Sequence, residues 1–394
     1  MRRPAWLLPG LTAVVAAAIS YLKSWHCRSN FFQSPDSYTH LCYSDIPALF
    51  GSRGLDQGIN PYADPLNSME YPVGTGYIAS SIARFSADFI QFFDINVVAL
   101  AILFVTVTIL LARQSESHWP LFALAPAVIA SLYINWDLWG ITALVIGLLL
   151  LRKERFDLAG VLLGLSIAIK FFPVFMMPAF FIYFLMRGEG RARSAITFFG
   201  YISLTWIAVN LSTAINHFEG WSRFYTFNQD RGVDLGSFWY ALDLLFGIRF
   251  SHLNLLVALI GILFVTFLWR PIRHAIGVTK EDPYRMLLLL SFLSLAFLFS
   301  FNKVYSPQYI LWLTPLAVLL LASSRERSGS ERALFWVWQS GEALYHLAIW
   351  QYLAEFSGGQ GLSEPLYALS IIIRMLSLGV FALSLARARL SLPS

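Results

Sequence analysis

Residues 95–112 read INVVALAILFVTVTILLA, and this stretch contains no charged side chain. A run of this length is typical of a helix that crosses the hydrocarbon core of a bilayer. Comparable apolar runs recur along the 394 residues, of which 57% are hydrophobic and only 13% are charged. Soluble globular chains carry about 25% charged residues. The sequence therefore predicts an all-α, multi-spanning integral membrane protein.

This composition excludes a cytosolic enzyme, a secreted disulfide scaffold, a disordered chain and a nucleic-acid-binding protein. A soluble domain of this size cannot bury so much apolar surface in one core. The net charge of +5 needs no polyanionic partner, since cytoplasmic loops of membrane proteins collect Lys and Arg. Breaks in hydropathy predict about twelve helices, several of them short, near 6–22, 95–112, 120–134, 138–151, 158–172, 173–186, 195–215, 253–269, 286–301, 308–322, 333–352 and 366–385.

Basic residues gather in alternate loops, which predicts the orientation of the chain. A cytoplasmic N-terminus places every dense basic cluster on the cytoplasmic side, as the positive-inside rule expects. These clusters are 152–155, 187–193, 270–285, 325–332 and 387–389. We therefore expect a protein of the plasma membrane whose first span, after Arg2 and Arg3, is retained rather than cleaved.

Two long segments then face the extracytoplasmic side, residues 24–93 and 216–250, within a single domain over 1–394. Loops longer than about 15 residues are usually functional or disordered, and the first is too aromatic for disorder. Within it, residues 73–85 are moderately apolar and predict a helix on the membrane surface. The only cysteines, Cys27 and Cys42, both lie near its start, where a disulfide and two free thiols are equally compatible with the sequence.

Asp45 stands out among the carboxylates of the first loop. It lies in the sequence Tyr43-Ser44-Asp45-Ile46-Pro47, where the chain turns back toward apolar residues. A partly buried carboxylate at the mouth of a cavity can accept a proton from a sugar hydroxyl, because burial raises its pKa. The alternative is structural: Ser44 or Asp45 caps a helix that begins at Ile46. The sequence leaves both roles open.

Four cations on the same side suit an anionic group. Lys170, Lys303, Arg223 and Arg231 lie at or near predicted helix ends. In a poorly hydrated site such charges stabilise a departing phosphate, which makes them candidates for binding a phosphorylated donor. The alternatives are lysines that extend toward the interface and arginines paired with neighbouring aspartates.

Aromatic side chains beside amides and carboxylates suit sugar binding, because a ring stacks on the sugar and the polar groups bind its hydroxyls. An interfacial aromatic belt explains most Trp and Tyr residues, but Asp137 lies between two short helices, where a carboxylate is a functional candidate. The candidates for sugar or acceptor binding are Tyr43, Tyr62, Glu70, Tyr71, Asn135, Asp137, Tyr305 and Gln308.

Glu342 and Arg374 lie at similar depth within the last two predicted spans. We expect them to face each other as a structural ion pair, with proton handling as the alternative role. The sequence contains no Walker A loop, Gly-x-Ser-x-Gly or His-Glu-x-x-His motif, and no Cys/His set with zinc spacing. We predict no metal ion and no cofactor.

Several short motifs resemble those of polytopic C-type glycosyltransferases, in particular the actinobacterial mannosyltransferase-like group of family 87. They are the early Asp45, Asn60-Pro61-Tyr62, Glu70-Tyr71-Pro72, Asn135-Trp136-Asp137, Lys170-Phe171-Phe172-Pro173 and Tyr305-Ser306-Pro307-Gln308-Tyr309. The resemblance implies a C-type glycosyltransferase fold, an inverting reaction and a first-loop aspartate as the base, which is Asp45 here. The first loop lacks an Asp-x-Asp pair, so no divalent metal is expected.

The resemblance further implies a polyprenyl-phosphate sugar as donor, since the outer face has no supply of nucleotide sugars. We expect transfer of a hexose, mannose being favoured, to a cell-envelope glycan or glycolipid, with membrane lipids as the other partners and no nucleic acid. Two rival functions are a transporter or flippase of lipid-linked sugars and a non-catalytic membrane scaffold. A transporter usually shows inverted repeats and a midplane site, whereas the polar residues here gather on one side.

Overall fold

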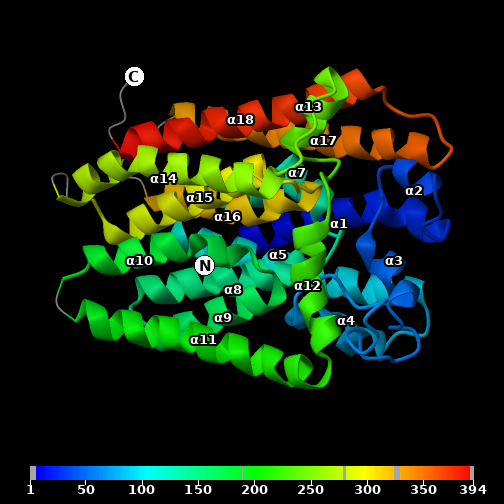
Figure 1. Ribbon diagram of the computed structural model, residues 1–394, viewed down its shortest axis with the longest axis horizontal. Coiled ribbons are helices and arrows are strands. Elements are labelled where there is room, and N and C mark those ends of the chain that lie inside the picture. Colours follow the sequence, from blue (N-terminus) through cyan, green and yellow to red (C-terminus); the bar gives the residue numbers. More distant parts are fainter. Residues whose placement is uncertain (1–5, 189, 278–280, 324–328, 391–394) are drawn as a thin grey trace.

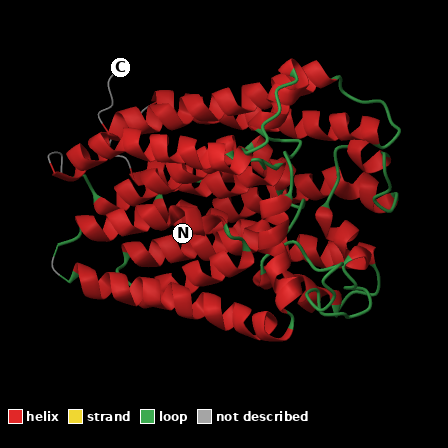
Figure 2. Cartoon of the chain, viewed as in Figure 1, coloured by secondary structure: helices red, strands yellow, loops and turns green. Residues whose placement is uncertain are grey.

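The computed structural model describes residues 6–188, 190–277, 281–323 and 329–390. Within these ranges the chain is helical with connecting loops and contains no strand (Figure 2). The all-helical fold predicted from the apolar runs is therefore present. Long helices lie side by side along the longest axis of the molecule (Figure 1).

Six described helices are long and apolar enough to cross a membrane. They are α1 (Leu7–Ser29), α5 (Phe89–Gln114), α11 (Arg191–Asn216), α14 (Leu253–Gly277), α15 (Pro283–Phe301) and α18 (Glu364–Leu390). Other predicted segments form helices that are shorter or more polar: α8 (Asp137–Arg152), α9 (Phe156–Ile169), η1 (Phe172–Met176), α10 (Met177–Met186), η2 (Pro307–Tyr309), α16 (Ile310–Ser323) and α17 (Gly329–Phe356). Of the roughly twelve predicted segments, six are therefore supported as full spans.

The continuous helix predicted near 120–134 is wrong. The segment forms two short helices, α6 (Pro120–Ala123) and α7 (Pro126–Ser131), with Leu124 and Ala125 between them. Pro126 begins α7, where its missing N–H costs no hydrogen bond. A proline at that position also disfavours helical geometry in the preceding residue, and Ala125 is extended. Helix α7 leads into the loop that carries Asn135, and Asp137 begins α8 directly after that loop.

Helices α10 and α18 end, and α11 begins, at the same end of the molecule, at the left in Figure 1, and basic residues lie at these helix ends. Arg187 Nη2 lies 2.9 Å from Glu154 Oε1, and Arg389 Nη1 lies 2.7 Å from Glu331 Oε1. The predicted basic positions Arg2, Arg3, Arg325 and Arg327 lie outside the described residues. The first loop and the connections of α12 (Phe218–Asp230) lie toward the other end. The clustering of basic groups at one end is the arrangement that the sidedness prediction requires.

The first loop is compact and contains α2 (Asp36–Thr39), α3 (Asp45–Ser52) and α4 (Val73–Ala83). A disulfide joins Cys27 to Cys42 and closes its first part. The helix predicted over 73–85 is present as α4, which packs on α9 and α11. Its glycines permit this approach: a Cβ on Gly74 would lie 2.7 Å from the Ala168 carbonyl oxygen. The second loop contains α12 and α13 (Phe238–Phe246).

Candidate active site

A cavity of about 570 Å³ opens among the first loop, the end of α9, α12 and the connection between α15 and η2. Seven residues predicted from the sequence line it: Asp45, Glu70, Tyr71, Lys170, Arg231, Lys303 and Gln308. A second part of the lining is apolar and aromatic: Phe171, Phe172, Phe175, Phe224, Phe227 and Leu298. The cavity therefore combines two acids, three cations and an apolar wall.

Ser44, and not Asp45, is the cap of α3. Its hydroxyl accepts a hydrogen bond from the backbone N–H of Ile46 at 3.2 Å and donates to the carbonyl of Tyr133 at 2.7 Å. The Asp45 carboxylate is therefore free to accept a hydrogen bond from the Tyr71 hydroxyl, which lies 2.9 Å from Oδ2. The Asp45 backbone N–H donates to the Ile134 carbonyl at 2.8 Å. These contacts fix the first turn of α3 beside the cavity and leave the carboxylate facing it.

The pKa of Asp45 lies above its ordinary value. Burial is the main cause, because a poorly hydrated site disfavours the charged carboxylate. Hydrogen bonds from Tyr71 and Tyr43 and the charge of Lys170 lower the pKa without cancelling the effect of burial. In turn, the charge of Asp45 is the main cause that raises the pKa of Tyr43. Asp45 has the environment of a proton acceptor with enhanced basicity.

Lys170 joins this acid to a second, fully buried carboxylate. The Lys170 ammonium lies 4.0 Å from the centre of the Tyr71 ring and 3.5 Å from Asp137 Oδ2. The indole N–H of Trp312 donates to Asp137 Oδ1 at 2.7 Å. Helix α9 ends at Ile169, so Lys170 adopts an extended backbone that directs it out of the helix. Asp137 thus holds the ammonium in place behind Tyr71 rather than lining the cavity itself.

Lys303 and Arg231 form a second positive region of the cavity lining. Lys303 Nζ donates to the Gln229 carbonyl at 2.8 Å, and Arg231 Nη2 lies 2.7 Å from Asp234 Oδ1. The Asp234 N–H donates to the Lys303 carbonyl at 2.8 Å, which ties both segments together. The pKa of Lys303 is lowered, first by burial and then by the charge of Arg231. Two cations held this close favour an anion between them.

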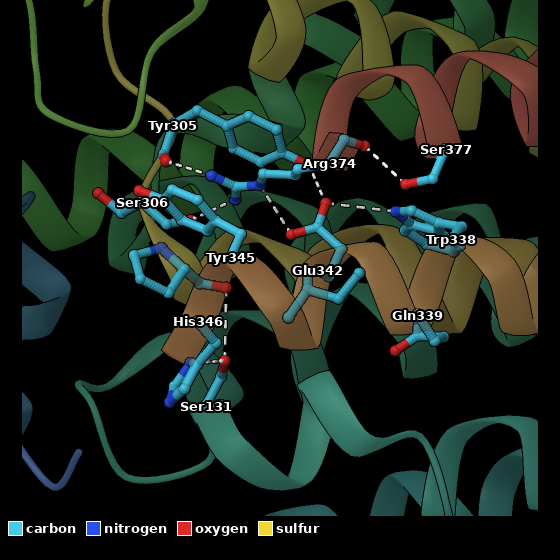
Figure 3. Close-up of polar contacts among 12 residues, drawn as sticks. Ser131, Tyr305, Ser306, Trp338, Gln339, Glu342, Tyr345, His346, Arg374 and Ser377 are labelled. Carbon is cyan, nitrogen blue, oxygen red and sulfur yellow. Dashed lines mark hydrogen bonds and ion pairs between the residues drawn. The ribbon is translucent and has the colours of Figure 1, made fainter. Parts of the chain in front are cut away.

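The loop that carries Lys303 is held from behind by the buried pair Glu342 and Arg374. Arg374 Nε lies 2.8 Å from Glu342 Oε2, and both side chains are almost fully buried. The guanidinium also donates to the carbonyls of Tyr305 at 2.8 Å and Ser306 at 3.1 Å. It lies between the rings of Tyr305 and Tyr345 (Figure 3). The two groups therefore face each other, and they also position the backbone between Lys303 and Gln308.

Several predicted residues lie outside the cavity lining. Tyr62 is buried, and its hydroxyl donates to the carbonyls of Tyr71 and Pro72. Tyr305 is buried with its hydroxyl on Glu342. Asn135 accepts from the backbone N–H of Asp137 at 3.2 Å. These side chains lie outside the cavity lining and stabilise the segments that form it, rather than presenting their polar groups to a bound sugar.

Tyr43 and Arg223 also lie outside the lining of this cavity. The Tyr43 ring packs on Tyr38, with 5.2 Å between centroids, and on Trp350. Arg223 lies over the Phe227 ring on α12, 5.9 Å from its centre. Arg223 is thus placed on the helix that borders the cavity, away from the two positive regions.

Some residues of the site carry no recognisable sequence signal. Arg53 makes a two-pronged contact with Glu70, at 2.8 Å and 3.0 Å, and so neutralises a carboxylate of the lining. Trp312 binds Asp137 from a helix 175 residues further along the chain. Both contacts join distant segments. Only their residue types, an Arg and a Trp in polar surroundings, offered a hint.

Comparison with known proteins identifies the family of the chain. Residues 71–300 match the model of glycosyltransferase family 87, while no curated protein matches the chain. The matched range contains Tyr71, Asp137, Lys170 and Arg231, whereas Asp45 and Lys303 lie on either side of it. The match covers more than half of the 394 residues and confirms the resemblance predicted from the motifs. The chain therefore belongs to glycosyltransferase family 87.

Proposed function

We propose that the protein is an inverting glycosyltransferase that moves a hexose, with mannose favoured, from a polyprenyl-phosphate donor to a cell-envelope glycan or glycolipid. The observation that carries this proposal is the shared cavity, in which Asp45 faces Lys170, Lys303 and Arg231. An acid with a raised pKa serves as general base, and fixed cations stabilise a leaving phosphate. The sidedness predicted from the basic clusters places the cavity on the outer face.

The reaction needs one base and one stabilised leaving group. Asp45 accepts the proton of an acceptor hydroxyl while the acceptor oxygen attacks the anomeric carbon. The bond from that carbon to the phosphate oxygen breaks, and polyprenyl phosphate leaves with the bonding electrons. Attack on the face opposite the phosphate inverts the anomeric centre. Lys303 and Arg231 then meet the negative charge that develops on the departing oxygen.

The form of the cavity suits an amphipathic donor. Its cations are set at the loop between α15 and η2, at the end of α9 and after α12, whereas aromatic side chains line the wall toward η1 and α12. A phosphate has complementary charge for the first region, and a prenyl chain has complementary polarity for the second. Glu70 and Gln308 supply polar groups for sugar hydroxyls.

The direct test is transfer of radiolabelled sugar from a polyprenyl-phosphate sugar to a panel of glycan acceptors, with the purified protein in vesicles. The proposal expects labelled product. Translocation of the intact sugar lipid without product indicates the flippase instead, and neither activity with any donor indicates a scaffold.

Replacing Lys303 by glutamine is expected to lower kcat/KM for the donor by about 10- to 100-fold. Hydrogen bonds to charged groups contribute about 1.5–3 kcal/mol, and the glutamine amide stays polar but has no charge and is one bond shorter. Lys153→Gln is the matched control, because Lys153 is exposed, follows the end of α8 and does not line the cavity. Steady-state kinetics with varied donor measure the effect. An unchanged kcat/KM removes Lys303 from donor binding.

Replacing Tyr71 by phenylalanine is expected to move the acid limb of the pH profile to higher pH. The Tyr71 hydroxyl stabilises the charged form of Asp45, so its loss raises the pKa of a base that must be deprotonated. The ring remains and keeps its contact with Lys170. Tyr240→Phe is the control, since that hydroxyl contacts Tyr352. The measurement is kcat/KM against pH, and an unmoved limb contradicts the assignment.

A further inference from the structure

Two histidines and an aspartate meet at the base of the first loop, apart from the cavity. His26 Nε2, near the end of α1, lies 2.9 Å from Asp36 Oδ2. His40 Nδ1, just after α2, lies 2.9 Å from Asp36 Oδ1. One ligand atom from each residue lies within 4.8 Å of the others. The imidazole rings stack with 3.6 Å between their centres, so both present nitrogen to one carboxylate.

The three side chains are open to solvent. Their exposed fractions are 42% for His26, 32% for Asp36 and 45% for His40, so an ion can reach them from water. The Asp36 carboxylate presents one oxygen to His26 and the other to His40, so one acid and two imidazoles offer ligand atoms to the same point.

We propose that His26, Asp36 and His40 form a binding site for a divalent transition-metal ion, with Zn²⁺ as the best match. Imidazole nitrogens with one carboxylate suit zinc, copper or nickel better than the oxygen-seeking Ca²⁺ or Mg²⁺. Tetrahedral zinc with bonds of about 2.0–2.1 Å separates its ligand atoms by about 3.3 Å. The two nitrogen–oxygen separations, 2.9 Å each, are shorter than that value, so the side chains would move apart to admit the ion, and water would complete its coordination. This site departs from the sequence-based prediction of no metal ion.

Zinc at this position would lock the segment that leads to Asp45. The neighbouring Cys27 and Cys42 close the same segment with a disulfide. Tyr38, between the ligands Asp36 and His40, stacks on the Tyr43 ring. An ion that cross-links α1 to α2 therefore restrains Tyr43 and the start of α3 without contacting the cavity. The site is structural and independent of the chemistry of sugar transfer.

The test uses the full chain in detergent, purified through a tag free of histidine and stripped with EDTA. Isothermal titration with Zn²⁺ is expected to give one site per chain, with a higher Tm in its presence and no such shift with Mg²⁺. Bound Co²⁺ is expected to show the visible absorption of a low-coordinate ion. His40→Gln is expected to weaken binding at least tenfold, since loss of even an outer partner costs about 10- to 100-fold.

His252→Gln is the matched control, because His252 is exposed and lies between α13 and α14, outside the trio. It is expected to bind Zn²⁺ as the wild type does. The Tm of every variant in EDTA shows whether it is folded, and a second variant, His26→Gln, repeats the measurement from the other helix. The proposal is overturned if the wild type does not bind Zn²⁺ or if both ligand variants bind it unchanged. In either case the trio only forms hydrogen bonds that join α1 to α2.

Discussion

Asp45→Asn is expected to lower the rate of sugar transfer by about 10²- to 10⁴-fold, the contribution typical of a general base. The amide has almost the shape of the carboxylate. Its oxygen can still accept the hydrogen bond from the Tyr71 hydroxyl, which lies 2.9 Å from Oδ2 in the wild type. It cannot accept a proton at neutral pH. The loss should therefore fall on kcat, with the KM for the donor nearly unchanged. Single-turnover transfer of labelled sugar measures it.

Asp157→Asn is the matched control, since Asp157 is a partly exposed carboxylate in the first turn of α9 at the basic end. It should transfer sugar at the wild-type rate. The pH profile gives an independent check. Because the pKa of Asp45 is raised, wild-type activity should fall on acidification at a pH above the ordinary aspartate value of about 3.9. Undiminished transfer by Asp45→Asn would remove Asp45 as the base.

The helical, membrane-type fold could be predicted because apolar runs carry their own signal. Helix α5 covers the uncharged stretch at 95–112 and extends it at both ends. The short α9 was also predicted, near 158–172, and ends at Ile169. The break before Pro126 was missed because apolar residues continue across it, although Pro126 disfavours helical geometry at Ala125. Helix α17 illustrates the limit: it has 28 residues, yet Gln339, Glu342 and His346 are buried against partners rather than exposed to lipid.

The cavity was partly predictable for a related reason. Asp45, Lys170 and Lys303 are charged residues at the ends of apolar segments, and such positions meet at one end of a helical bundle. What local sequence could not supply is the partner of each charge. Asp137 appeared to be a sugar ligand, but it holds Lys170. Pairing across the bundle depends on long-range packing, which no local pattern reports.

Arg374→Leu is expected to destabilise the fold more than any other single change considered, by about 3–5 kcal/mol in the free energy of unfolding. Removing one member of a buried ion pair leaves the other charge without compensation, and the Glu342 side chain is only 1% exposed. The carbonyls of Tyr305 and Ser306 also lose their donor. Thermal and denaturant unfolding in detergent measure the loss. Arg249→Leu, which removes a largely exposed ion pair with Asp243, should cost less than about 1 kcal/mol.

A second substitution separates the two roles of Arg374. Glu342→Leu combined with Arg374→Leu removes the uncompensated charge, so much of the stability should return. The loop that carries Lys303 would still lack the guanidinium that holds its carbonyls, so the KM for the donor should stay high. Arg374→Lys keeps the charge but lacks the planar guanidinium that donates to both carbonyls. It should therefore also raise the KM for the donor. Recovery of donor binding together with stability in the double variant would mean that Arg374 only neutralises Glu342.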